Sequence, residues 1–190
     1  MTIIAAQIPP EVVEADVLTL DQLRELLDYD PESGVFRWRV ARRNGSVPAG
    51  TIAGTLKVTG YIRIEINRQF YPAHRLAWFY VNGEWPSSYI DHIDNCRSNN
   101  RFSNLRLATN SQNLCNARMP RTNTSGYKGV TWSKKSQRWQ AHIKVRSKSL
   151  HLGLFDAKED AHAAVQSARI KYHGAFANDG FPLPTEARDD

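Results

Sequence analysis

The sequence predicts an α+β protein made of two small modules. Residues 89–113 change from a short apolar run to a long polar loop, a second apolar run and a capped helix. Residues 126–178 contain three runs typical of strands and then a helix, which predicts a three-stranded antiparallel sheet packed on one helix. A hydrophobic fraction of 41% with five tryptophans is enough for real cores and excludes a disordered chain.

The chain of 190 residues is long enough for one or two small domains. We expect an acidic mobile leader over residues 1–17, a first domain over 18–118 and a linker over 119–125. The second domain then covers residues 126–178, and residues 179–190 form a tail.

Two helices and three strands are expected before residue 89. Thr19 and Gln22 have the spacing of a capping box, and the leucine stripe behind them predicts a helix over residues 20–28 that stops before Pro31. Strands are expected over residues 35–40, 61–66 and 70–71, with a turn at 67–68, and a second helix is expected over residues 73–81.

His74 lies at the start of that second helix, where it can be a structural or a catalytic group. A histidine on an otherwise apolar element is more often a satisfied structural group, and we prefer that interpretation. The sequence leaves open whether His74 or Asp94 takes part in catalysis.

The second module is expected to have strands over residues 127–132, 138–145 and 150–155. Asp156, with Glu159 three residues later, predicts the cap of a helix that ends near residues 173–174. Alternation along the middle strand places five polar residues on one face: Arg138, Gln140, His142, Lys144 and Arg146. The other face is apolar and can pack on the helix.

Positive charge is concentrated near the second module. The formal net charge is +6, and residues 118–155 contain nine bases and no acid. A block this one-sided indicates a polyanion as partner, and the tryptophans within it weaken the alternative of a merely solvated surface.

Composition also limits the compartment. The chain has no apolar run long enough to cross a bilayer, and its first ten residues lack the basic start of a secretory signal. Cys96 and Cys115 form no CxxC pair, so a zinc ribbon is excluded and a reducing compartment is the simplest interpretation. A single disulfide between them is the alternative.

The stretch of residues 89–113 has the side chains that phosphodiester hydrolysis needs. Asp91 and Asn113 offer two oxygen ligands with a single negative charge, which suits a hard cation such as Mg²⁺ or Mn²⁺. His92 can take the proton from water near neutral pH, and the amide of Asn104 can orient its imidazole. The alternative is that Asp91 and His92 are ordinary residues of a surface turn.

These residues resemble the HNH motif, the ββα-metal finger of phage and intron-encoded homing endonucleases, in which D-H is followed by N-x-L-R and S-x-x-N. The resemblance covers about residues 18–117 and implies His92 as general base, with Asn104 as the residue that orients it. It also implies Asp91 and Asn113 as metal ligands. The family's final histidine is an asparagine here, which leaves the identity of the metal open.

The second module resembles the plant ethylene-response-factor (AP-two type) DNA-binding domain, through Y-K-G-V, R-W-x-A-x-I and L-G-x-F-D. A sheet with one basic face can enter the major groove of DNA. The implied contacts are Lys128, Arg138, Trp139, Lys144 and Arg146. Trp139 is as readily explained as a core residue.

Together these features predict a metal-dependent DNA endonuclease of the HNH homing type that acts on double-stranded DNA inside a host cell. We expect a monomer, with a dimer as the alternative, and no small-molecule cofactor or membrane partner. One alternative is a sequence-specific DNA-binding regulator with an inactive HNH scaffold. Another is an RNA-binding factor, which fits the basic sheet less well because the major groove of A-form RNA is deep and narrow.

Overall fold

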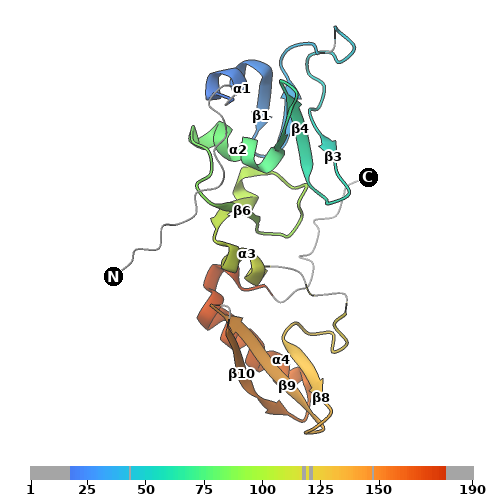
Figure 1. Cartoon of the computed structure of the whole chain (residues 1–190), viewed down its shortest axis with the longest axis vertical. Coiled ribbons are helices and arrows are strands. Elements are labelled where there is room, and N and C mark those ends of the chain that lie inside the picture. Colours follow the sequence, from blue (N-terminus) through green and yellow to red (C-terminus); the bar gives the residue numbers. More distant parts are fainter. Residues whose placement is uncertain (1–17, 43, 117–118, 120–121, 147, 179–190) are drawn as a thin grey trace, which may run out of the picture.

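The computed structural model describes residues 18–42, 44–116, 119, 122–146 and 148–178. The elements of the first module lie at one end of an elongated molecule and those of the second module at the other end (Figure 1). Helix α3 (Asn110–Asn116) lies between them. The expected leader and tail fall outside the described residues, as does part of the expected linker.

The first helix is shorter than expected. Helix α1 (Leu20–Leu26) begins with the predicted capping box, because Thr19 and Gln22 each accept a hydrogen bond from the other's backbone N–H. The prediction that it continues to residue 28 is wrong, because strand β1 (Leu27–Asp30) pairs with strand β2 (Val35–Trp38) in an antiparallel hairpin. In β2 the buried side chains Phe36 and Trp38 alternate with exposed ones, as predicted.

A second sheet follows, with the order β3-β4-β5. Its strands are β3 (Thr55–Leu56), which was not expected, β4 (Ile62–Ile66) and β5 (Gln69–Pro72). The predicted turn is confirmed by positive φ angles at Asn67 and Arg68. Helix α2 (Ala73–Asn82) then ends at Gly83, whose φ of 75° is left-handed as a C-terminal cap requires.

The predicted order of strand, loop, strand and helix is confirmed in the middle of the chain. Strand β6 (Tyr89–His92) pairs antiparallel with β7 (Leu105–Ala108), and a short 3₁₀ turn, η1 (Phe102–Asn104), leads into β7. Helix α3 follows directly and packs against both strands. Cys96 and Cys115 are free thiols.

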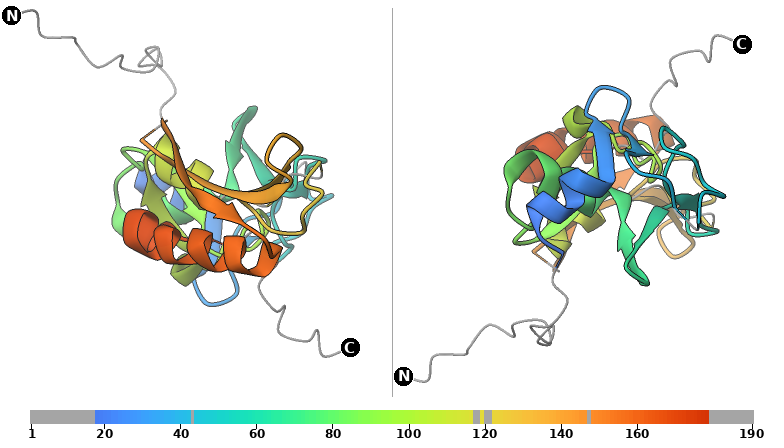
Figure 2. Two further views of the ribbon diagram at one scale, coloured as in Figure 1. Left: turned by 90° about the horizontal axis from the view of Figure 1, so that it is seen from below. Right: turned by 90° about the horizontal axis from the view of Figure 1, so that it is seen from above.

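The second module is a three-stranded antiparallel sheet on one helix, as predicted. Its strands are β8 (Val130–Ser133), β9 (Arg138–Val145) and β10 (Lys148–Phe155), with β9 in the centre. Figure 2 shows α4 (Lys158–His173) against one face of this sheet, and a 3₁₀ turn, η2 (Gly174–Phe176), follows it. The cap is Ala157 and not Asp156, because the Asp156 carboxylate is paired with Arg138.

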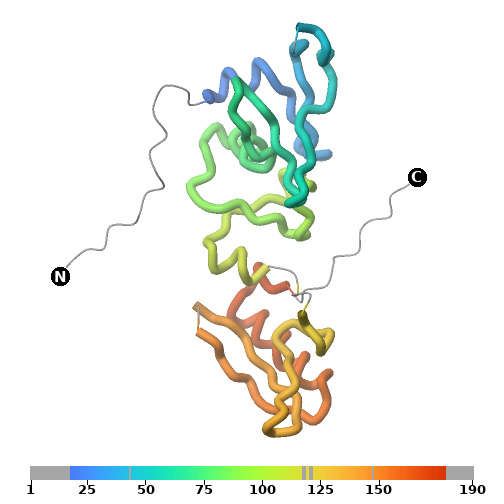
Figure 3. Tube along the Cα trace, turned by 45° about the vertical axis from the view of Figure 1, so that its right-hand side comes forward, coloured from blue at the N-terminus to red at the C-terminus, as the bar shows by residue number. Residues whose placement is uncertain are grey.

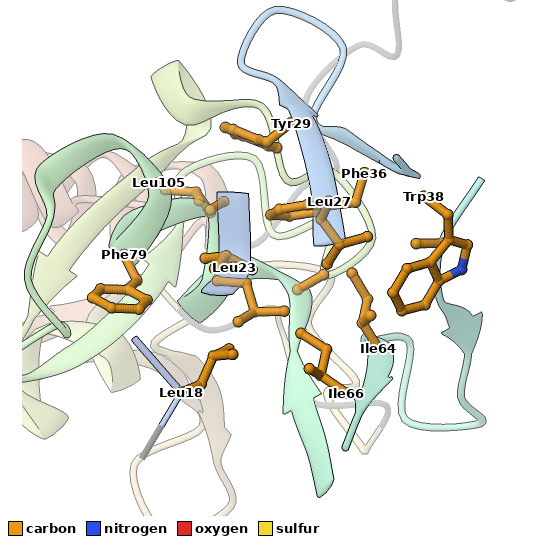
Figure 4. Packing of buried hydrophobic residues seen from close by; sticks show 14 of the residues in the cluster. Leu18, Leu23, Leu27, Tyr29, Phe36, Trp38, Ile64, Ile66, Phe79 and Leu105 are labelled. Atoms are coloured by element: carbon orange, nitrogen blue, oxygen red, sulfur yellow. The ribbon is translucent and has the colours of Figure 1, made fainter. Parts of the chain in front are cut away.

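Each module has its own hydrophobic core. Figure 4 shows the first, where side chains of α1, the hairpin and β4 interdigitate around Leu23, Leu27 and Ile64. The second is much smaller and consists of Val130, Ala141, Ala161 and Val165, with aromatic side chains packed at its edge. Within the described residues no helix is long and apolar enough to span a membrane.

The β1–β2 hairpin supports the polar loop that joins β6 to η1. The hydroxyl of Tyr29 donates a hydrogen bond of 2.7 Å to the carbonyl oxygen of Asn100. Gly34 lies so close to this loop that a Cβ atom would be 2.3 Å from the backbone nitrogen of Arg101 and 2.4 Å from the carbonyl carbon of Asn100. Only glycine fits there.

We therefore expect Gly34→Ala to lower the free energy of unfolding by about 2–4 kcal/mol, since it combines a left-handed backbone with a steric clash. Gly45 is the matched control, because its φ of 87° is also left-handed but a Cβ there meets nothing within 4 Å. Gly45→Ala should cost only about 1–2 kcal/mol. Urea unfolding measures both, and equal losses would contradict the role assigned to the clash.

Candidate active site

Three of the sequence-predicted site residues line one cleft. Asp91 and His92 are at the end of β6, and Asn113 faces them from α3. The cleft has a volume of about 730 Å³, and Tyr61 and Arg97 also contribute to its wall. The structure thus brings an acid, an imidazole and an amide to one surface.

The side chain that contacts the His92 imidazole is Asn100. Its Oδ1 lies 3.3 Å from His92 Nε2, and its Nδ2 donates to the carbonyl oxygen of Ser98. An amide oxygen only accepts hydrogen bonds, so this contact assigns the imidazole proton to Nε2. Nδ1 is then the nitrogen that can take a proton.

Burial keeps both histidines of this region neutral. Desolvation lowers the pKa of His92 below its ordinary value of 6.5, and the Asn100 hydrogen bond and the nearby carboxylates of Asp94 and Asp91 offset part of that effect. His74 packs against His92 with ring centroids 5.2 Å apart, and burial lowers its pKa to about 3. His92 is therefore in the form that a general base requires near neutral pH.

The amide of Asn104, expected to orient His92, forms its hydrogen bonds within the loop, so that role stays a prediction. Its Oδ1 accepts a hydrogen bond from the backbone of Asp94, and its Nδ2 donates to the Asp94 carboxylate and to the carbonyl oxygen of Asn99. The Asp94 carboxylate also accepts from Asn99. With its amide used in this way, Asn104 closes the loop of residues 94–104, and both N–H groups of its amide are already donated to other acceptors.

Asp91 is a buried carboxylate with two partners. Its Oδ2 accepts hydrogen bonds from Arg106 Nε at 2.9 Å and Nη2 at 2.7 Å, and Arg106 is its direct neighbour on β7. Asn116 Nδ2 donates to both carboxylate oxygens, at 2.9 and 3.0 Å. Only 4% of the Asp91 side chain is exposed, so these partners compensate a charge that has lost nearly all of its contact with water.

The oxygens of Asp91 and Asn113 form a donor set that fits a hard divalent cation. One carboxylate and one amide oxygen bordering an open cleft leave room for waters and phosphate oxygens, as magnesium sites do. The described residues contain no group of three or more His, Cys, Asp or Glu side chains able to hold a metal.

Arg97 adds a cation to the wall of the cleft. Its guanidinium lies 4.9 Å from the ring centroid of Tyr61 and donates to the carbonyl oxygen of Thr59. The ring and the carbonyl hold the guanidinium beside the cleft. It can therefore pair with a phosphate oxygen of a bound nucleic acid.

The sheet residues expected to contact DNA lie in different environments. Lys144 and Arg146 are exposed. Arg138 forms a bidentate ion pair with Asp156, and Trp139 packs against the second core. Lys128 is half-buried and donates to the carbonyl oxygens of Cys115 and Asn178, so in this structure it connects the two modules, and its expected DNA contact stays a prediction.

Sequence reasoning missed four residues that act on this site: Asn100, Arg106, Asn116 and Arg97. Asn100 and Arg97 belong to a polar loop with several asparagines and arginines, and the sequence alone does not show which of them reaches the cleft. One signal was available for Asn116, because it follows Asn113 by one helical turn and therefore shares its face. Arg106 is predictable only from the strand register.

Comparison with known proteins finds a family model that matches part of the first module, and it also finds relatives of the chain. Residues 71–115 match the family model described as HNH endonuclease. Protein 3.8 of Escherichia phage T7 is 38% identical over 114 residues, which cover 58% of this chain and 93% of the phage protein.

Two plant relatives are similar to shorter parts of the chain. APETALA2-like protein 2 of Oryza sativa subsp. indica is 38% identical over 73 residues, which cover 38% of this chain and 17% of the plant protein. The AP2-like ethylene-responsive transcription factor TOE2 of Arabidopsis thaliana is 38% identical over 66 residues, covering 35% of this chain and 14% of that protein. No solved structure matches the chain.

The two plant similarities span less than a fifth of each plant protein, so they describe a shared segment and not a shared whole. The phage similarity spans nearly all of its partner. The chain therefore belongs to the family of phage T7 protein 3.8, and it contains an HNH endonuclease domain at residues 71–115.

Proposed function

We propose that this protein is a metal-dependent DNA endonuclease of the HNH homing type, with residues 18–118 as nuclease domain and residues 126–178 as DNA-binding domain. The observation that carries the proposal is the common cleft of Asp91, His92 and Asn113, in which a neutral imidazole faces a carboxylate and an amide. Hydrolysis of a phosphodiester needs a base and positive charge, and this cleft offers groups for both.

His92 acts as the general base. Its Nδ1 takes a proton from a water molecule as the water oxygen attacks phosphorus, while Asn100 holds the proton on Nε2. The phosphorus–oxygen bond on the 3′ side breaks, and the leaving oxygen gains a proton from solvent. The products are a 5′-phosphate and a 3′-hydroxyl.

Asp91 and Asn113 would hold a divalent cation, Mg²⁺ or Mn²⁺. Bound there, it would supply positive charge to the phosphate and to the leaving oxygen. Arg97 binds a further phosphate oxygen and keeps the DNA strand at the cleft wall.

The second module anchors the enzyme on duplex DNA. The sheet face away from α4 contains Gln140, His142 and Lys144, and Arg146 follows at its end. We assign this face to the major groove, with Lys144 and Arg146 as phosphate or base contacts. The similarity to plant transcription factors supports the assignment.

His92→Ala should lower the rate of DNA cleavage about 100-fold or more, because it removes the general base. The cleavage rate is measured by incubating plasmid and phage genomic DNA with the purified protein in Mg²⁺, in Mn²⁺ or in chelator. Cleavage should vanish in chelator. His162→Gln, a histidine of α4 in the second module, is the control and should cleave as the wild type does.

Cleavage by His92→Ala at the wild-type rate would contradict the assignment of the base. If the wild type binds a specific DNA site but cleaves it with no metal, the protein is instead a DNA-binding regulator with an inactive nuclease scaffold. Strong competition by RNA for that binding would argue against duplex DNA as partner.

The cleavage rate should depend on pH through His92. Because burial lowers the pKa of His92 below 6.5, the neutral base persists to lower pH than an exposed histidine would. The rate should be constant above about pH 6.5 and fall about tenfold per unit of pH below the lowered pKa. A pH–rate profile at fixed metal concentration tests this, and a midpoint above 6.5 would disagree with the buried base.

Asn100→Ala and Asn104→Ala should differ in their effect on that profile. Loss of the Asn100 hydrogen bond removes a contact that raises the pKa of His92, so its midpoint should move to lower pH and the rate should fall roughly tenfold. Asn104→Ala opens the loop and lowers stability, but the midpoint should not move because Asn104 does not touch the imidazole. The opposite pattern would restore Asn104 as the orienting residue.

A further inference from the structure

The chain that follows α4 returns to the first module. Figure 3 shows its last described part, in red, beside α3. Arg106 Nη1 donates to the carbonyl oxygen of Ala175 at 2.6 Å, and its guanidinium lies 3.8 Å from the ring centroid of Phe176. Asn178 Nδ2 donates to Asn116 Oδ1 at 3.2 Å. Residues 174–178 are termed the C-terminal strap below.

These three contacts of the strap end on Arg106 and Asn116, the two residues that hold Asp91. Arg106 uses Nε and Nη2 for the Asp91 carboxylate and Nη1 for the strap. Asn116 uses Nδ2 for that carboxylate and for the carbonyl oxygen of His92, and Oδ1 for the strap. The strap is therefore connected to the Asp91 carboxylate in two ways, once through Arg106 and once through Asn116.

We propose that the C-terminal strap is part of the nuclease active site, because it fixes Arg106 and Asn116 and through them the orientation of Asp91. Arg106, Asn116 and Phe176 are then positioning residues, supplied by both modules. The consequence for catalysis rests on the proposed nuclease function.

The hydrogen-bond count at Asp91 explains why orientation matters. A carboxylate has about four sites for hydrogen bonds or ligands, two on each oxygen. Arg106 and Asn116 occupy Oδ2 with three contacts, whereas among the described residues Oδ1 has only the contact to Asn116. Oδ1 is therefore the oxygen left for a cation, and the direction of its free lone pair depends on how firmly the two partners are held.

An arginine side chain needs help to stay in one place. Its long chain loses much conformational freedom when it is fixed, and one ion pair leaves several rotamers open. In this protein the Arg106 side chain is only 18% exposed, and its guanidinium lies between the Asp91 carboxylate, the Ala175 carbonyl and the Phe176 ring. Three different contacts on one planar group define a single orientation.

Phe176→Ala in the full-length protein tests the proposal. The single-turnover cleavage rate at saturating DNA should fall about tenfold, because small displacements of a catalytic group are costly, while DNA affinity in chelator changes less than twofold. Phe176→Tyr keeps the ring and should restore the rate. Tyr172→Ala, an exposed aromatic of α4, is the matched control and should cleave as the wild type does.

A second measurement reports on the mobility of the Arg106 side chain and does not require that the protein cleaves DNA. In ¹⁵N NMR the Arg106 Nε–H should exchange with solvent at least tenfold faster in Phe176→Ala than in the wild type or Tyr172→Ala. Arg106→Lys keeps the charge but loses the planar fork, so it should lower the cleavage rate about tenfold although Phe176 is intact.

These readouts separate the strap from the nuclease function. If the wild type cleaves DNA, an unchanged rate or an unchanged Arg106 signal in folded Phe176→Ala overturns the proposal. If Phe176→Ala does not fold, wild-type cleavage by Arg106→Lys overturns it. A wild type that never cleaves contradicts the nuclease proposal alone, and the Arg106 exchange rate then decides whether the strap holds the guanidinium.

Discussion

The charge on Asp91 is the constraint on which the middle of this molecule depends. A carboxylate that is 4% exposed has lost nearly all of its hydration, so it has to be paired and hydrogen-bonded by protein groups. Arg106 comes from the paired strand and Asn116 from the last position of α3, so neutralising one charge joins β6, β7 and α3. Removing one partner of a buried ion pair typically lowers the free energy of unfolding by about 3–5 kcal/mol. A single substitution in this arrangement is therefore strongly destabilising.

A second polar network determines where His92 lies. Asp94 accepts hydrogen bonds from Asn99, Asn104 and the backbone of Cys96, which folds the loop of residues 94–104 onto itself. The loop is also held from outside, by the Tyr29 hydroxyl and by the close approach of Gly34. Asn100 therefore meets His92 from a backbone that is fixed on both sides. The position of His92 thus depends on the β1–β2 hairpin, which is far from His92 in the sequence.

Local patterns in the sequence were sufficient to predict most of the helices and strands. The capping box at Thr19, the turn at residues 67–68 and the unit at residues 89–113 all depend on neighbours in the chain, and all were predicted. The errors involve partners distant in sequence. Residues 27–30 continue a leucine stripe that suits a helix, yet their pairing with β2 makes them a strand. Asp156 has the right side chain for a cap, but Arg138 takes its carboxylate. Asn100 and Asn104 have identical chemistry, and only the fold of the loop decides which one faces the imidazole.

The second module is too small to stabilise itself well by burial alone. Its fully buried core has four small aliphatic side chains, against fifteen buried residues in the first core, and the stabilisation from burial scales with apolar area. Contacts with the first module therefore matter for it: Lys128 donates to the carbonyl oxygen of Cys115, and Arg169 in turn donates to that of Lys128. These contacts and the strap reach α3 from the same side, next to the residues that hold Asp91. A change that loosens the docking of the second module thus also acts on the Asp91 carboxylate, because Asn116 contacts both.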